Sequence, residues 1–117
     1  MALELTTAQA LRLWQKANLH FVRDEDPDLS MRQMSILLTV YLEAPPHTVR
    51  GLAVRLNVSK PVITRALDSM GKQNLISRRR DDTDRRNVLI QRTVEGALFI
   101  ERLADTIMAV ASKQDRL

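Results

Sequence analysis

An apolar stripe at helical spacing lies near the start of the chain. Ala10, Trp14, Ala17 and Phe21 follow one another at intervals of four, three and four residues, which places them on one face of an α-helix. The stripe predicts a helix over residues 7–23. The helix is expected to stop there because a proline among mutually repelling acids follows.

The next apolar group predicts a second helix. Ser30 and Gln33 have the spacing of a capping box, so this helix should begin at Ser30. Its predicted apolar face consists of Met34, Leu37, Leu38 and Tyr41. A stiff linker containing two prolines then occupies residues 44–47.

Two helices joined by a tight turn are expected over residues 48–73. Thr48 is the predicted cap of a short third helix, and Asn57 and Val58 form the turn after it. Ser59 is the predicted cap of a fourth helix, with Pro61 tolerated in its first turn. The apolar positions that should face the core from this helix are Val62 or Ile63, Ala66, Leu67 and Met70. Asn74 then accepts the left-handed conformation that often ends a helix.

A hairpin and a last helix complete the predicted order. Extended runs are expected at residues 75–80 and 87–92, around the turn-forming acids of residues 81–84. Thr93 should cap the last helix, whose predicted apolar stripe is Ala97, Ile100, Ala104, Ile107 and Ala111, with Phe99 and Leu103 alongside. We therefore expect a mainly α fold with a small β-hairpin wing, a winged helix-turn-helix. Residues 1–117 would form one domain, with an N-terminal helix and acidic loop at 1–29, the core at 30–92 and a C-terminal helix at 93–117.

Composition narrows the class of protein. The 117 residues are 44% hydrophobic and 27% charged, and none is cysteine, which excludes disulfides and thiolate metal sites. His20 and His47 lie far apart, so neither a metal nor another cofactor is expected. The chain has no apolar run of the roughly 20 residues that a membrane span needs, and no secretory signal. We expect a cytoplasmic protein without a membrane partner. It shows no catalytic motif, so an enzyme is not expected.

The positive charge is concentrated in the middle of the chain. Residues 48–92 hold eleven Lys and Arg against four acids, a net charge of +7, whereas the remaining residues carry −3. Such asymmetry indicates a polyanionic partner. Ordinary solvated surface is the alternative reading.

The fourth helix and the hairpin supply the candidate DNA contacts. The second helix of a helix-turn-helix can enter the major groove, and its groove side would carry Ser59, Lys60, Pro61, Thr64 and Arg65, with Asp68 as a further candidate. By itself this side could equally be the solvated face of an amphipathic helix. Five arginines on one hairpin, however, repel each other and suit a phosphate backbone or a narrow minor groove. The candidate contacts on the hairpin are Arg78, Arg80, Asp84, Arg85 and Arg86. Asp84 would orient a neighbouring arginine by a bidentate contact, and Asp81 and Asp82 would close the turn; alternatively, the acids only offset the arginines.

Two motifs resemble the MarR family of winged-helix transcription regulators. Residues 52–65, LAVRLNVSKPVITR, are similar to that family's helix-turn-helix. Residues 81–90, DDTDRRNVLI, followed by Thr93 and Gly96, are similar to its wing signature. The resemblance covers residues 30–96. It implies a sequence-specific regulator of transcription, often a repressor, that binds double-stranded DNA as a homodimer on a pseudo-palindromic operator. Arg86 would reach the minor groove, steadied by Asp84.

The resemblance also implies a small-molecule effector near the dimer junction. Residues that could line such a pocket are Trp14, His20, Met31, Met34 and Tyr41, although such residues at helical spacing are usually core. Dimer contacts are expected from Trp14, Phe21, Ile100 and Ile107, or these residues belong to the monomer core. Arg92 and Asn74 depart from the family pattern. The chain also ends near Leu117, where typical members continue into a further helix, so the interface and any pocket are expected to be reduced or rearranged. The other function that we consider is a winged-helix protein-interaction module without DNA binding.

Overall fold

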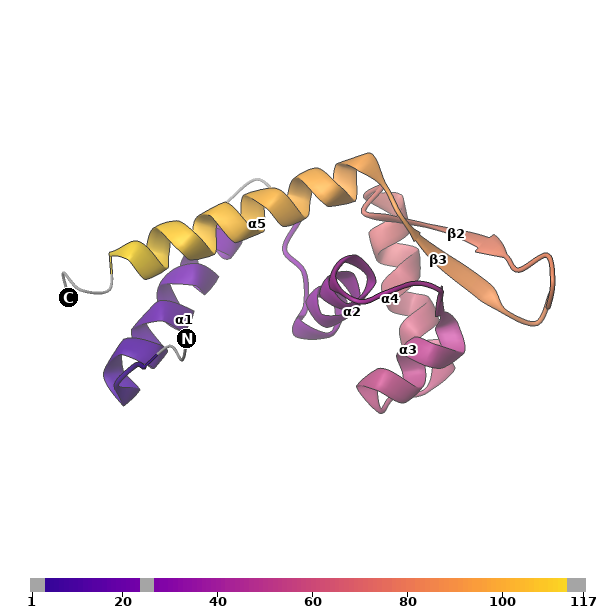
Figure 1. Cartoon of the computed structure of the whole chain (residues 1–117), viewed down its shortest axis with the longest axis horizontal. Coiled ribbons are helices and arrows are strands. Elements are labelled where there is room, and N and C mark those ends of the chain that lie inside the picture. Colours follow the sequence, from indigo (N-terminus) through magenta and orange to yellow (C-terminus); the bar gives the residue numbers. More distant parts are fainter. Residues whose placement is uncertain (1–3, 24–26, 114–117) are drawn as a thin grey trace. The chain divides into compact units, whose positions relative to one another are not determined.

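The structure is a computed structural model of the chain, and it describes residues 4–23 and 27–113. Its helices and strands follow one another in the order that the sequence predicts, with one short strand added (Figure 1). The elements are α1 (Thr7–Arg23), α2 (Met31–Leu42), β1 (His47–Thr48), α3 (Val49–Leu56), α4 (Lys60–Lys72), β2 (Ile76–Arg80), β3 (Val88–Arg92) and α5 (Val94–Ser112).

Contacts within the chain divide it into two compact units. One unit comprises residues 29–100, and the other comprises residues 1–28 with 101–117. Helix α5 begins in the first and continues into the second. The first unit contains the helix-turn-helix and the hairpin, and the second contains α1 with the greater part of α5.

The core of the unit of residues 29–100 lies where α2, α3, α4 and the sheet meet. The side chains buried most completely in it are Ile36, Leu37, Val40, Leu52, Ile63, Leu67 and Met70. For α4 the predicted inward face is confirmed, with Ile63 rather than Val62 buried. For α2 the predicted face was partly right: Leu37 is fully buried as predicted, but so are Ile36 and Val40. Met34 packs partly buried against the core, and Leu38 has intermediate exposure.

Local side chains fix the ends of these helices. The capping box of α2 is confirmed, because the Ser30 amide donates to Gln33 Oε1 (2.8 Å) and the Gln33 amide donates to Ser30 Oγ (3.1 Å). Thr48 caps α3, accepting from the Gly51 amide at 2.9 Å. Asn57 ends α3 in the left-handed conformation, with φ of 57°. Short-range chemistry of this kind is why the helix bounds could be predicted.

The sheet has three antiparallel strands in the order β1-β3-β2. Strands β2 and β3 form the expected hairpin, which projects away from the helices to a free tip (Figure 1). Strand β1 was not predicted; His47 pairs with Ile90 and Thr48 with Leu89. A two-residue strand has no sequence pattern of its own and exists only because β3 lies beside it.

The hydroxyl of Tyr41 joins α2 to the base of the hairpin and to the start of α5. It lies 2.9 Å from the Leu75 carbonyl and 3.2 Å from the Thr93 carbonyl, and it accepts a hydrogen bond from the Thr93 amide at 3.0 Å. Gly96 leaves the room for this hydroxyl, since a Cβ at residue 96 would collide with the Tyr41 oxygen and the Leu75 carbonyl. Here glycine is required by close approach rather than by its backbone angles.

Arg92, a departure from the family pattern, closes the end of α2. Its Nε donates to the Val40 carbonyl at 2.9 Å and its Nη2 to the Glu43 carbonyl at 3.2 Å. Its guanidinium also lies 5.8 Å from the centre of the Tyr41 ring. The last carbonyls of a helix have no partner within the helix, and here an arginine of the sheet supplies one.

In the other unit the buried apolar residues are Ala17, Leu103 and Val110. The predicted inward stripe of α5 was out of phase except at Ile100, which packs partly buried against the core. Phe99 and Leu103, which were predicted to lie alongside that stripe, are on the buried side. Phe99, Leu103 and Val110 are buried, whereas Ala97, Ala104, Ile107 and Ala111 are exposed. Because α5 is rich in apolar residues, two neighbouring stripes fit the helical repeat, and the sequence alone does not choose between them. None of the described helices is both long and apolar enough to cross a membrane.

Candidate nucleic-acid interface

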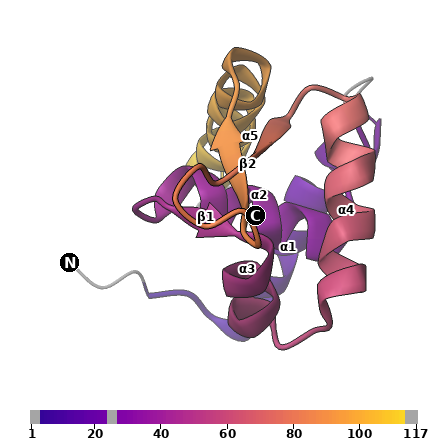
Figure 2. The same cartoon turned by 90° about the vertical axis from the view of Figure 1, so that its right-hand side faces the viewer.

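The side of α4 opposite the core carries the residues that the sequence proposes for the major groove. Lys60, Thr64 and Arg65 are exposed, as are Ser59 and Pro61 at the start of the helix. Figure 2 shows α4 lying along one side of this unit, with α3 and the sheet beside it. Asp68 and Lys72 are exposed as well, so α4 has one buried apolar face and one exposed face with three cations, a hydroxyl and one carboxylate.

The N-terminus of α4 differs from the prediction in one respect. Ser59 stands at the capping position, but its side chain makes no capping hydrogen bond. Pro61 in the first turn has no amide hydrogen to be capped. The first turn of a helix favours anions because its amides point outward with the positive end of the helix dipole. The exposed Ser59 hydroxyl thus lies at the positive end of the α4 dipole without a capping bond.

At the tip of the hairpin, Asp84 holds Arg86 in a two-point contact. Asp84 Oδ1 accepts from Arg86 Nε at 3.1 Å, and Oδ2 accepts from Arg86 Nη2 at 3.2 Å. Oδ1 also accepts from the Arg86 backbone amide at 3.1 Å. The side chain of Arg86 nevertheless remains 82% exposed. The bidentate orientation expected from the sequence is thus present in the geometry.

Hydrogen bonds within the turn lower the pKa values of Asp81 and Asp84. Hydrogen bonds from the side chain and then the backbone of Arg86 lower the pKa of Asp84 below the usual aspartate range. The pKa of Asp81 is lowered by hydrogen bonds from the side chain and backbone of Thr83. Both effects arise because these bonds favour the charged carboxylate. Asp81 and Asp84 are therefore ionised at neutral pH and hold the turn as acceptors.

Asp82, Arg80 and Arg85 at the wing tip each have different contacts. Asp82 is not a hydrogen-bonded turn former; its carboxylate lies 3.6 Å from Arg79 and is 92% exposed. Arg80 Nη1 donates to the Arg85 carbonyl at 2.9 Å, so it closes the wing loop. The exposed side chain of Arg85 extends the basic surface next to Arg86.

Arg78 points back toward α4 and forms an ion pair with Asp68, with 2.8 Å between Nη1 and Oδ1. Both residues were predicted on the DNA side, without a contact between them. Their opposite charges on either side of a helix-to-strand connection were the available signal. The guanidinium of Arg78 is thus already engaged by a carboxylate in the free protein.

The residues proposed for an effector pocket are divided between the two compact units. Met31 is 76% exposed, and the Tyr41 hydroxyl is used by the backbone of residues 75 and 93. Trp14 and His20 are exposed on α1, in the other compact unit. A small-molecule effector stays a prediction from the family resemblance.

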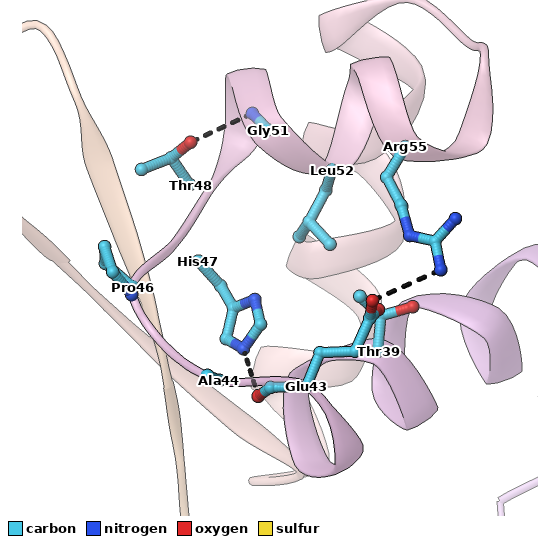
Figure 3. A pocket seen from close by; sticks show the side chains of 9 residues that line it. All are labelled: Thr39, Glu43, Ala44, Pro46, His47, Thr48, Gly51, Leu52 and Arg55. Atoms are coloured by element: carbon cyan, nitrogen blue, oxygen red, sulfur yellow. Dashed lines mark hydrogen bonds and ion pairs between the residues drawn. The ribbon is translucent and has the colours of Figure 1, made fainter.

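A pocket that the sequence did not suggest lies between the end of α2, β1 and α3 (Figure 3). It has a volume of about 220 Å³, and none of the five proposed effector residues lines it. In its wall Arg55 Nη2 lies 3.2 Å from Glu43 Oε1, and His47 Nε2 lies 3.1 Å from the Glu43 carbonyl oxygen. The polar groups of this wall are thus largely engaged with each other. Within residues 4–23 and 27–113 no three His, Asp or Glu side chains gather closely enough to hold a metal ion.

A helix-turn-helix formed by α3 and α4, with its outer side exposed, is followed by a basic β-hairpin. Together they define a winged helix-turn-helix protein. A family model described as the MarR family matches residues 29–88, which is just over half of the 117 residues. The chain belongs to the MarR family.

Two curated relatives from Bacillus subtilis (strain 168) are similar in sequence. The chain is 38% identical over 70 residues to the "Organic hydroperoxide resistance transcriptional regulator", covering 60% of this chain and 48% of that protein. It is 34% identical over 76 residues to the "HTH-type transcriptional repressor YetL", covering 63% and 45% respectively. The chain thus spans about half the length of the curated relatives that it matches.

Solved structures agree on the fold. A mutant of S. aureus MepR superposes with a TM-score of 0.75 at 22% identity, covering 97% of this chain and 86% of that one. Streptococcus pneumoniae FabT in complex with DNA superposes with a TM-score of 0.68 at 24% identity, covering 91% and 72%. At these identities the likeness concerns the fold alone.

Proposed function

We propose that this protein is a sequence-specific regulator of transcription that binds double-stranded DNA. In this proposal α4 enters the major groove with Lys60, Thr64 and Arg65, and Arg86 reaches the adjacent minor groove. The observation that carries it is the wing tip, where Asp84 holds Arg86 at two points while leaving it exposed. No catalytic step is involved.

The arrangement at the tip suits DNA better than it suits a protein partner. An arginine ordered before binding loses less side-chain freedom when it enters a groove. Long cationic side chains with little apolar surface around them favour the negative potential of a narrow minor groove. A protein-interaction surface would instead be expected to carry apolar or aromatic residues at its centre.

Repression and dimerisation are further parts of the proposal. Repression is supported by the printed name of one relative, YetL. A homodimer on a pseudo-palindromic operator would present two copies of α4 to successive major grooves. Exposed apolar side chains on α1 and α5, among them Leu11, Trp14, Ile107 and Met108, support a second copy as the partner of these helices.

Fluorescence anisotropy with a labelled DNA duplex across a salt series tests DNA binding. We expect log K to fall linearly with log salt, with a slope of about −0.9 for each phosphate contact. Arg86→Ala should weaken binding about tenfold or more, since an ordered contact in the groove is lost. Lys113→Ala, which removes one exposed charge just after the end of α5, is the matched control. Absence of binding by folded protein at low salt would refute the proposal and favour a protein-interaction module.

Sedimentation of the wild type and of Ile107→Glu tests the dimer. A charge buried at an interface costs far more than one in water, so this variant should sediment as a monomer if the wild type is a dimer. Glu101→Lys changes charge on the same helix at an exposed polar position and should leave the dimer intact. A dimer that persists in Ile107→Glu would place the interface elsewhere.

A further inference from the structure

The ion pair between Asp68 and Arg78 connects the two elements that the proposed function assigns to DNA. Asp68 belongs to α4 and Arg78 to β2. Their charged atoms are 2.8 Å apart, and the side chains are only 53% and 33% exposed. The guanidinium also lies over Gly71, with Nη2 3.9 Å from where a Cβ would stand. Arg78 thus rests along the last two turns of α4.

Arg78 lies on β2 just beyond the buried base of the hairpin. Ile76 is the buried residue of β2, and the four residues that follow it are exposed. Its partner strand is anchored at Ile90, which stands opposite Arg78 and is also buried. Residues two apart on a strand and residues opposed across an antiparallel pair share a face, so Arg78 lies on the same face of the hairpin as Ile76 and Ile90. Apolar packing therefore holds the base of the hairpin, and the Asp68 contact is made on that same face, at the level where this packing ends.

Binding both grooves at once demands a fixed relation between helix and wing. A misplacement of about 1 Å can remove much of the benefit of a positioned group, and the tip of a two-stranded hairpin magnifies any rotation at its base. A charge-assisted hydrogen bond is directional as well as attractive. A contact between α4 and β2 is well placed to restrict that rotation.

We propose that Asp68 and Arg78 are positioning residues that fix the angle between the recognition helix and the wing, through the 2.8 Å ion pair joining α4 to β2. The proposal rests on DNA binding as the proposed function. It assigns Arg78 a role through Asp68 rather than a direct contact with phosphate. It also gives Asp68 a reason to be present on a surface that otherwise attracts an anion.

The sign of one substitution distinguishes positioning from simple charge. Asp68→Asn removes a negative charge beside the proposed DNA surface, so charge alone predicts tighter binding. Loss of positioning predicts weaker binding, by about three- to fivefold for a pair of this exposure. Asp82→Asn makes the same charge change on the wing, where Asp82 is 92% exposed and 3.6 Å from its partner. We expect the control to bind as well as the wild type or slightly better.

A double-mutant cycle with Arg86→Ala shows whether the effect passes through the wing. If Asp68 positions the wing, removing Arg86 should cost less affinity in the Asp68→Asn background than in the wild type. If the two substitutions act independently, their fold-changes in the dissociation constant should multiply. Asp68→Asn binding that equals or exceeds the wild type, or a cycle without coupling, would overturn the proposal.

Hydrogen exchange without DNA separates this proposal from the proposed function. Amides in the β2–β3 ladder should exchange faster in Asp68→Asn than in the wild type or in Asp82→Asn, because the ladder opens more often when its tie to α4 is lost. If the wild type binds no DNA, the proposed function is refuted. Faster exchange in Asp68→Asn would still support an ion pair that holds the wing against α4. Unchanged exchange in Asp68→Asn would overturn the link itself, whatever the DNA result.

Discussion

Removing the hydroxyl of Tyr41 tests the joint between α2, the base of the wing and α5. Tyr41→Phe keeps the ring and deletes one oxygen. That oxygen accepts from the Thr93 amide at 3.0 Å and can donate to the Leu75 carbonyl at 2.9 Å or to the Thr93 carbonyl at 3.2 Å. Because a hydroxyl has one hydrogen, two hydrogen bonds are lost at a time, not three.

The expected loss of stability follows from these two bonds. Each intramolecular hydrogen bond contributes about 1 kcal/mol net, and a buried group left unpaired costs somewhat more. The site is only part-buried, so water can partly satisfy the freed groups. We therefore expect the free energy of unfolding to fall by about 2 kcal/mol, which corresponds to a decrease in Tm of about 8 °C for a domain of this size.

Urea unfolding followed by circular dichroism measures this loss. The slope of free energy against urea should not change, because the surface exposed on unfolding is the same. Thr39→Val is the matched control: its hydroxyl, also on α2, donates to the Ser35 carbonyl of the same helix at 2.7 Å. The control should lose less than about 0.5 kcal/mol. Equal losses in the two variants would refute the view that the Tyr41 hydroxyl joins three elements.

Three other predictions concern neighbouring sites. Gly96→Ala should lower the free energy of unfolding by about 1–3 kcal/mol because its methyl group would overlap the Tyr41 hydroxyl; thermal unfolding measures this, and adding Tyr41→Phe should relieve part of it, so additive losses would contradict the cause. Arg92→Met should cost about 1–2 kcal/mol, because two carbonyls at the end of α2 lose their donors; an unchanged Tm would show that water replaces them. The pKa of Asp84 is depressed, so its bonds to Arg86 stabilise the tip above the unfolded pKa and are lost only as pH falls through the folded pKa. A carbon NMR titration should show a pKa for Asp84 below that of an ordinary aspartate, and a higher pKa in Arg86→Ala. The same pKa in both proteins would exclude Arg86 as the cause.

Local chemistry made much of the fold predictable. Ser30, Thr48 and Asn57 act within four residues of their own positions, so the helix ends could be predicted from short patterns. The alternation of buried and exposed positions on α4 was likewise clear, because its apolar residues fit one helical phase. On α5 two phases fit, and the choice depended on neighbours distant in sequence. Strand β1 depended on such neighbours entirely.

In the candidate site, too, contacts between residues close in sequence were predictable and contacts between distant elements were not. The contact of Asp84 with Arg86 spans two residues and was predictable from the motif alone. The pair of Asp68 with Arg78 depends on how the hairpin returns to α4, so the sequence placed both residues on one surface without joining them. The pocket beside Glu43 requires α2, β1 and α3 to be placed together. Such contacts are properties of the assembled fold.

The bonds of the Tyr41 hydroxyl also bear on the order in which this protein folds. They close chain segments of 34 and 52 residues, whereas α3 and α4 pack across a turn of only a few residues. Closing a long segment costs more chain entropy than closing a short one, so contacts of high sequence separation tend to form late. A bond that is absent from the transition state affects the rate of unfolding and leaves the rate of folding nearly unchanged. Tyr41 is therefore expected to determine how long a folded molecule lasts rather than how quickly it forms.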